Sequence, residues 1–174
     1  MVKGYKDLIS NYFKDHSFVE SNIKSFNRFV DKDLPKIVDD IGDIIPTIIP
    51  QEVENFKIKL NDIKVGMPEI TEADGSKRKL YPVEARLRKL TYSAPITLGV
   101  SAHINDIQRE SFQIEIGRLP IMLKSKYCHL ANLKKADLIK HGEDPVDWGG
   151  YFILNGNERV LTSVEDLASN KLFV

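Results

Sequence analysis

The fold is decided by Thr91–Ile104, which reads TYSAPITLGVSAHI. Apolar side chains recur there at every second position, at Ile96, Leu98, Val100, Ala102 and Ile104. That period is typical of a β-strand with one buried face. The same alternation recurs at Phe56–Leu60 and at Phe112–Ile116. The sequence therefore predicts a mixed, largely antiparallel β region.

A different period governs the residues before these strands. Apolar side chains gather on one helical face within residues 5–16, 23–30 and 34–41. Pro35 suits the first turn of the third helix, because that turn needs no amide donor. We therefore expect a helical arm over residues 1–45 and a β region with short helices over residues 46–174. Together they make an α+β fold.

Shorter elements are expected between the strands. Residues 71–79 (TEADGSKRK) contain the turn pair Asp74-Gly75 and are expected to form an exposed loop. Short helices are predicted over residues 83–90 and 134–141. Asn155-Gly156 is the strongest hairpin signal in the chain, because a tight turn of the primed type needs positive φ angles.

The composition limits what the chain can do. Its 174 residues are enough for one domain with a buried core. With 25 basic and 25 acidic side chains the formal net charge is zero, which argues against a histone-like nucleic-acid binder. The single cysteine, Cys128, excludes an internal disulfide and a multi-cysteine zinc site. No apolar stretch approaches the ~20 residues of a membrane-spanning helix.

The charges are unevenly distributed along the chain. Residues 77–135 carry 12 basic and 4 acidic side chains, and acidic residues predominate on both sides of this block. A clustered basic block is typical of a protein that meets a polyanion. A solvated surface with its charges spread over several faces explains the count equally well. Arg86 and Lys89, within the block, are expected to be surface charges of a short helix, although Arg86 could equally be a packing or interface residue.

The residues form no convincing catalytic constellation. Neither of the common glycine-rich phosphate loops, GxxxxGK[ST] and GxGxxG, occurs, and neither GxSxG nor HExxH occurs. Cys128 is expected to be a small buried hydrophobic residue. We therefore assign no catalytic residue and no metal ligand to this chain.

Three stretches carry a resemblance to a known family. They are Tyr81–Pro95 (YPVEARLRKLTYSAP), Ile116–Ser125 (IGRLPIMLKS) and Trp148–Leu161 (WGGYFILNGNERVL). In this order they resemble the N-terminal part of the second-largest subunit of multisubunit DNA-directed RNA polymerase, of the archaeal or eukaryotic type. The resemblance covers roughly residues 5–172 and is weakest in the helical arm.

The resemblance implies a fold and a position. It places residues 46–174 in the first segment of the protrusion, a wall beside the main cleft that a later part of such subunits completes. The chain is then expected to be the beginning of a longer subunit, with edge strands and apolar surface exposed when it is alone. The resemblance implies a cytoplasmic location if the chain is archaeal and a nuclear one if it is eukaryotic.

The resemblance also implies partners and the chemistry of the assembly. The polymerase is a nucleotidyltransferase that uses two metal ions. Its magnesium is expected in the largest subunit and its zinc site downstream of this chain, so no cofactor is expected here. The implied role is a non-catalytic cleft wall. The implied partners are other polymerase subunits, the DNA template, the RNA–DNA hybrid and general transcription factors, and no membrane.

Four basic residues are candidates for contact with nucleic acid: Arg159, Arg118, Lys124 and Lys126. The family's Asn-Gly-x-Glu-Arg stretch faces the cleft near the hybrid, and a guanidinium suits a phosphate. Arg159 could instead form an ion pair with Glu158 or Asp147. Lys124 and Lys126 would share a face in an extended segment. Solvated or subunit-interface side chains remain the alternative for Arg118 and the two lysines.

Two other functions remain open. One is a stand-alone interaction module that binds a transcription factor or a polymerase subunit. The other is a small free-standing nucleic-acid binder that uses residues 77–135. The aromatic side chains of the arm (Phe13, Phe18, Phe26 and Phe29) discriminate between module and assembly. Packing within the chain favours an independent module, and exposure favours assembly.

Overall fold

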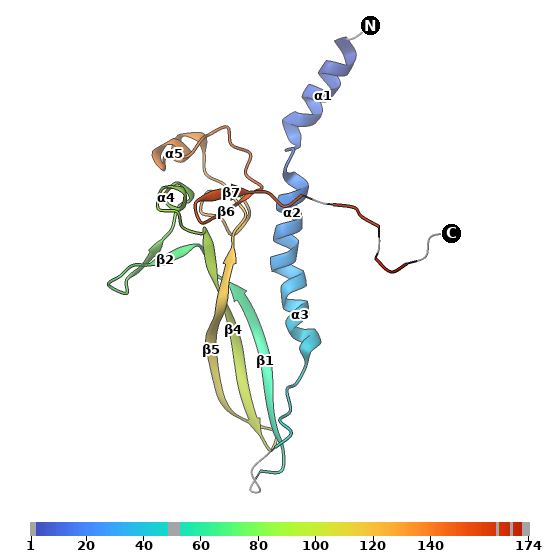
Figure 1. Cartoon of the computed structure of the whole chain (residues 1–174), viewed down its shortest axis with the longest axis vertical. Helices are drawn as coiled ribbons and strands as arrows, with labels where there is room; N and C mark the ends of the chain where they lie inside the picture. The colour runs from blue at the N-terminus through green and yellow to red at the C-terminus, as the bar shows by residue number, and fades with distance from the viewer. Residues whose placement is uncertain (1–2, 49–52, 163, 168, 172–174) are drawn as a thin grey trace.

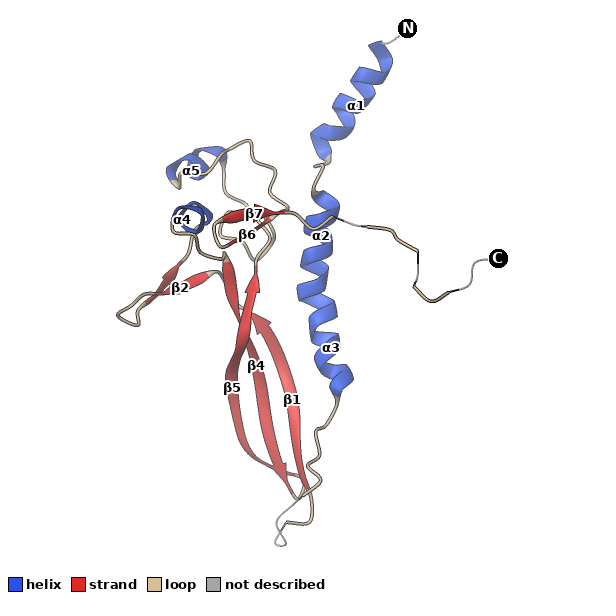
Figure 2. Ribbon diagram, in the orientation of Figure 1, coloured by secondary structure: helices blue, strands red, loops and turns tan. Residues whose placement is uncertain are grey.

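The computed structural model describes residues 3–48, 53–162, 164–167 and 169–171. Helices at the N-terminus lead into antiparallel strands (Figures 1 and 2), which confirms the α+β class. The helices are α1 (Lys3–Asp15), α2 (Glu20–Arg28), the π-helical turn η1 (Phe29–Asp33), α3 (Leu34–Ile41), α4 (Pro82–Leu87) and α5 (Lys135–Lys140). The strands are β1 (Phe56–Val65), β2 (Glu69–Thr71), β3 (Lys77–Lys79), β4 (Ser93–Ile104), β5 (Ile107–Pro120), β6 (Phe152–Leu154) and β7 (Asn157–Arg159).

The segments α2, η1 and α3 run end to end as one helical rod beside the sheet (Figure 1). Within η1 the amide of Leu34 donates to the carbonyl of Phe29, five residues earlier. Pro35 follows in the first turn of α3. In a regular α-helix the proline ring clashes with the carbonyl four residues earlier, and the wider π turn relieves that clash. The stripes at residues 23–30 and 34–41, expected as two helices, therefore form one rod.

The main sheet has three antiparallel strands in the order β1-β4-β5. Leu60 lies opposite Val100, which in turn lies opposite Phe112. Because opposed residues share a face, the alternating apolar side chains of all three strands lie on one side of the sheet. The three predicted strands are thus confirmed, although β5 is longer than its alternating core.

The apolar face of this sheet is only partly covered. After α3 the chain turns along the outer edge of β1, where Ile44 pairs with Ile58. Val38 of α3 is buried, whereas Phe112, Ile114 and Ile116 on β5 remain 48–53% exposed. Within the described part of the chain, β5 pairs with β4 alone. The apolar half-face on β5 is therefore open to solvent.

Residues 71–79 were expected to be a loop, and that expectation is wrong at both ends. Thr71 of β2 pairs with Lys77 of β3, and Ile70 pairs with Arg78. The turn between them is closed by Asp74, whose carboxylate accepts from the amide of Ser76 at 2.9 Å. The Asx turn is local, as the sequence indicates. The strand pairing on either side of it depends on contacts with the rest of the fold.

Four charged side chains fasten this β2–β3 hairpin to α4. Arg78 pairs with Glu72 at 2.6 Å and also with Glu84, and Arg88 bridges the same two carboxylates at 2.9 and 2.7 Å. Arg78 and then Arg88 hold the pKa of Glu84 at about 2, well below its ordinary 4.5. Two cations of the basic block are therefore neutralised by neighbouring carboxylates.

The core forms where three segments that are distant in sequence meet through backbone hydrogen bonds. The amide of Tyr92 donates to Ile153 O, and the amide of Ile121 donates to Tyr92 O, both at 2.9 Å. The amide of Leu123 donates to Tyr151 O at the same distance. The side chains of Tyr92, Ile121, Leu123 and Ile153 are fully buried. This junction joins β4, the turn after β5 and β6 into one unit.

Two consecutive glycines let the helical rod dock onto this junction. Gly149 and Gly150 both have positive φ angles, of 72° and 79°. A Cβ on Gly150 would lie 2.7 Å from Cβ of Val19, the residue that precedes α2. Position 150 therefore requires glycine for two reasons, the positive φ angle and the close approach of Val19. Phe18 contacts the Trp148 ring edge to face, at 5.7 Å between centroids.

Gly150→Ala should therefore destabilise the chain. A left-handed backbone costs alanine about 1–2 kcal/mol, and overpacking adds about 1–3 kcal/mol. Urea denaturation measures the free energy of unfolding. Gly75→Ala isolates the backbone effect, because Gly75 has a φ of 83° and open space around it. Gly117 has neither a positive φ angle nor a close neighbour, so Gly117→Ala should change the free energy of unfolding by less than about 0.5 kcal/mol. Equal effects of Gly150→Ala and Gly75→Ala would contradict the close approach to Val19.

Glu84→Gln should flatten the acid limb of the stability curve. The folded pKa of Glu84 is about 2 and its ordinary value is 4.5, so its stabilisation is complete above pH 4.5. It is lost as the pH falls from 4.5 towards 2. Urea titrations across this range should show a steeper loss in the unchanged chain than in Glu84→Gln. Glu165→Gln, at an exposed position, serves as the control, and identical slopes for all three chains would refute the expectation.

Candidate nucleic-acid interface

The Trp148–Leu161 stretch builds a hairpin that sits on the end of α4. Asn155 and Gly156, with φ angles of 51° and 78°, form the predicted turn between β6 and β7. The Gly156 amide donates to Leu90 O at 2.9 Å, and the Asn155 amide donates to Thr91 Oγ1 at 3.1 Å. The tip of the hairpin is therefore held by the residues between α4 and β4.

Arg86 ties the hairpin to α4 from the other side. Its guanidinium donates from Nε to Glu158, from Nη1 to Glu143 and from Nη2 to the Tyr151 hydroxyl, each at 2.8 Å. Burial disfavours the charged form of Arg86, but the two carboxylates outweigh burial and raise the pKa of the guanidinium. Of the two alternatives for Arg86, a surface charge or a packing residue, the structure supports packing within the chain. Its main partner Glu143 is almost fully buried.

Glu143 also holds the start of α4. Its second carboxylate oxygen accepts from the amide of Val83 at 2.6 Å, one of the amides at a helix start that has no partner within the helix. Together these contacts define a clamp of Arg86, Glu143, Tyr151 and Glu158. No motif in the sequence indicates it, because its members are separated by up to 72 residues.

Arg159 occupies an exposed position on β7, opposite Phe152 of β6. The two carboxylates that could have paired with it have other partners. Glu158 accepts from Arg86, and Asp147 accepts from the Tyr151 hydroxyl at 2.6 Å and from the Gly149 amide at 3.0 Å. Among the residues that the structure describes, Arg159 takes part in no ion pair. Its guanidinium is available to an external anion.

Arg118 is engaged within the chain. It donates to the hydroxyl of Ser93 at 3.3 Å, to the carbonyl of the same residue at 3.2 Å and to the carbonyl of Glu69. It also lies 3.7 Å from Glu115. These contacts connect β5 to the starts of β4 and β2. The side chain is nevertheless 36% exposed, so part of the guanidinium still faces solvent.

The segment of Lys124 and Lys126 is a turn and not an extended strand, so the condition under which the two side chains would share a face is not met. Lys124 lies in a turn with a φ of 60° and donates to the carbonyl of Asp147. Lys126 donates from Nζ to Asp31 of η1 at 2.8 Å, and its amide donates to Asn27 Oδ1 at 3.0 Å. The turn lets both the amide and the side chain of Lys126 contact the helical rod. The four predicted basic residues thus lie in different contact networks rather than in one cluster.

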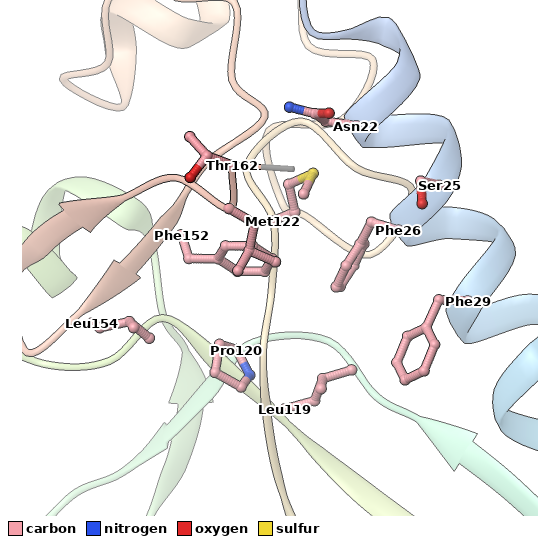
Figure 3. A pocket seen from close by; sticks show the side chains of 11 residues that line it. Asn22, Ser25, Phe26, Phe29, Leu119, Pro120, Met122, Phe152, Leu154 and Thr162 are labelled. Carbon is pink, nitrogen blue, oxygen red and sulfur yellow. The ribbon is translucent and has the colours of Figure 1, made fainter. Parts of the chain in front are cut away.

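An apolar cavity of about 590 Å³ lies between α2 and the hairpin (Figure 3). The figure shows the rings of Phe26 and Phe152 facing one another, with Phe29 and Leu119 on the side towards the sheet. The two rings contact edge to face at 5.7 Å. The cavity is lined mainly by carbon, so it suits an apolar group rather than a metal or a phosphate.

The described residues contain no group of three or more His, Cys, Asp or Glu side chains that could hold a metal ion. They also contain no helix that is long and apolar enough to cross a membrane.

Cys128 was expected to be a small buried hydrophobic residue, and the structure confirms that it is buried. Its Sγ lies 3.4 Å from the Tyr92 hydroxyl. Burial raises the pKa of this thiol, which makes it a poor nucleophile.

The chain is similar to known proteins over nearly its whole length. Residues 17–172 match the family model described as RNA polymerase beta subunit. The chain is 44% identical to DNA-directed RNA polymerase subunit Rpo2N of Methanocaldococcus jannaschii, over 96% of this chain and 34% of that subunit. It is 42% identical to Rpo2 of Saccharolobus solfataricus, over 96% of this chain and 14% of that subunit.

Another relative is Rpo2N of Halobacterium salinarum, 37% identical over 96% of this chain and 33% of that subunit. The chain therefore spans about a third of the length of the Rpo2N relatives and about a seventh of the Rpo2 relatives. Because the family model and these identities both extend over nearly all of its residues, the chain belongs to the RNA polymerase beta subunit family.

Proposed function

We propose that this chain is the N-terminal portion of the second subunit of an archaeal DNA-directed RNA polymerase and acts as a non-catalytic wall of the DNA cleft. One observation carries the proposal. The three stretches that resemble the family meet in the junction of Tyr92, Ile121 and Ile153. The hairpin built on this junction presents Arg159, a cation without an ion-pair partner among the described residues. A rigid scaffold that displays a cation suits the holding of a polyanion.

The chemistry of such an assembly is nucleotidyl transfer, which its metal ions would carry out in other parts of the enzyme. The residues of this chain supply position and charge instead. We propose that the chain is inactive on its own, that it belongs to the first segment of the protrusion, and that it works in the cytoplasm. Its partners would be the other polymerase subunits, the DNA, the RNA–DNA hybrid and general transcription factors.

The apolar surface that the chain leaves exposed favours assembly over a stand-alone module. The four aromatic residues of the arm do not discriminate, because Phe26 is 8% exposed and Phe13 stacks on Phe18, whereas Phe18 is 67% and Phe29 37% exposed. Helix α1 presents an exposed apolar stripe made of Tyr5, Leu8, Ile9 and Tyr12. Together with the open half-face on β5, this stripe leaves more apolar surface uncovered than an independent module would need.

The chain should therefore enter a transcribing complex when it is produced together with the other polymerase subunits and the remainder of its own subunit. Co-purification followed by a transcription assay measures this. Tyr92→Ala, which empties the core position at the junction, is the control for trapping of misfolded chain and should not be incorporated. The proposal would be refuted if the unchanged chain is incorporated no better than Tyr92→Ala.

Arg159→Gln should weaken the retention of nucleic acid by the assembled enzyme. One lost phosphate contact lowers the slope of log affinity against log salt by about 0.9. The joint change of Arg118, Lys124 and Lys126 to Gln should lower it further, since guanidinium and ammonium groups can share donors between internal acceptors and a phosphate. Lys135→Gln on α5 is the control. Unchanged slopes in both variants would defeat the assignment of phosphate contacts.

A further inference from the structure

Strand β7 places two residues of opposite charge, Glu158 and Arg159, next to each other. Glu158 is paired with Arg86, whereas Arg159 has no ion pair among the described residues. Glu158 lies opposite Ile153, whose side chain is fully buried, whereas Arg159 lies opposite Phe152. Neighbouring residues of a strand project to opposite faces. Whatever fixes the side chain of Glu158 therefore also fixes the face on which Arg159 emerges.

The partner of Glu158 is itself immobilised. Arg86 is held by the buried carboxylate of Glu143 and by the Tyr151 hydroxyl, so two of its three bonds go to groups outside β7. The third, from Nε to Glu158, spans 2.8 Å. A planar guanidinium with several fixed acceptors has little freedom left, so it can orient the remaining acceptor.

We infer that Arg86 is a positioning residue that acts through Glu158 to hold Arg159 towards nucleic acid. This inference rests on the proposed function, because it assigns Arg159 a phosphate contact. Glu158 is 55% exposed, so the fold does not need its burial. Its use is to anchor the short strand β7, which has only three residues and, within the described residues, one hairpin partner.

The direction in which the removal of Glu158 changes nucleic-acid affinity separates a positioning role from simple charge repulsion. Removal of a carboxylate near a polyanion site strengthens binding, because it removes repulsion. If Glu158 positions Arg159, its removal weakens binding instead. Glu72 offers a matched control: it is also a glutamate paired with arginines, Arg78 and Arg88, and its change to alanine alters the net charge by the same amount.

The test compares Glu158→Ala, Glu72→Ala, Arg159→Gln and the double variant Glu158→Ala/Arg159→Gln in the assembled polymerase. Dissociation from an RNA–DNA hybrid template is followed against salt concentration. Glu158→Ala should lower the salt slope by about 0.9, as Arg159→Gln does, and the double variant should match Arg159→Gln alone. Glu158→Gln, which keeps an acceptor for Arg86, should restore the slope. Tighter retention in Glu158→Ala, or additive effects in the double variant, would overturn the inference.

A second readout keeps the two proposals apart. In the full chain, ¹⁵N relaxation of the Arg159 amide should show greater mobility in Glu158→Ala than in Glu72→Ala. If mobility rises while Arg159→Gln leaves retention unchanged, the positioning holds and the phosphate contact fails. If mobility stays the same, Arg86 does not position Arg159, whatever the retention assay shows.

Discussion

The structure depends on a small set of backbone hydrogen bonds around Tyr92. This residue donates its amide to Ile153 and accepts from Ile121, so three segments separated by dozens of residues become one unit. The surrounding side chains exclude water, which makes each of these bonds costly to break. The sheet, the helical rod and the hairpin all attach to this unit, and none of them has a large core of its own.

Ion pairs, like these backbone hydrogen bonds, join segments that are distant in sequence. Half of the twelve basic residues at 77–135 pair with nearby carboxylates, as in the bridges of Arg78 and Arg88 to Glu72 and Glu84. Lys126 reaches Asp31 on the helical rod. Several of these ion pairs join elements that are distant in sequence. Among the described cations without an ion pair, Arg159 is the one that lies on the family's hairpin motif, where the neighbouring carboxylates serve Arg86 and Tyr151.

The fold leaves apolar surface in places that a self-contained domain would cover. Helix α1 lies beyond the end of the rod (Figure 1), and β5 is an edge strand of the main sheet, so the exposed stripe on α1 and the open half-face on β5 both lie at the periphery. The chain spans about a third of the length of its Rpo2N relatives. Under the proposed function these surfaces would face the rest of a larger assembly, and such surfaces need not be polar.

The sequence by itself determined the local structure. Alternation at Ile96–Ile104 identified the central strand, the apolar stripes identified the helices, and Asn155-Gly156 identified the hairpin, because period and turn chemistry act over a few residues. The family followed from three motifs for the same reason. Tertiary structure alone decided which charges are engaged. It assembled the Arg86 clamp, whose members lie up to 72 residues apart, and it folded the Lys124–Lys126 segment into a turn with a partner 99 residues away. Contacts over such distances leave no mark in any local pattern.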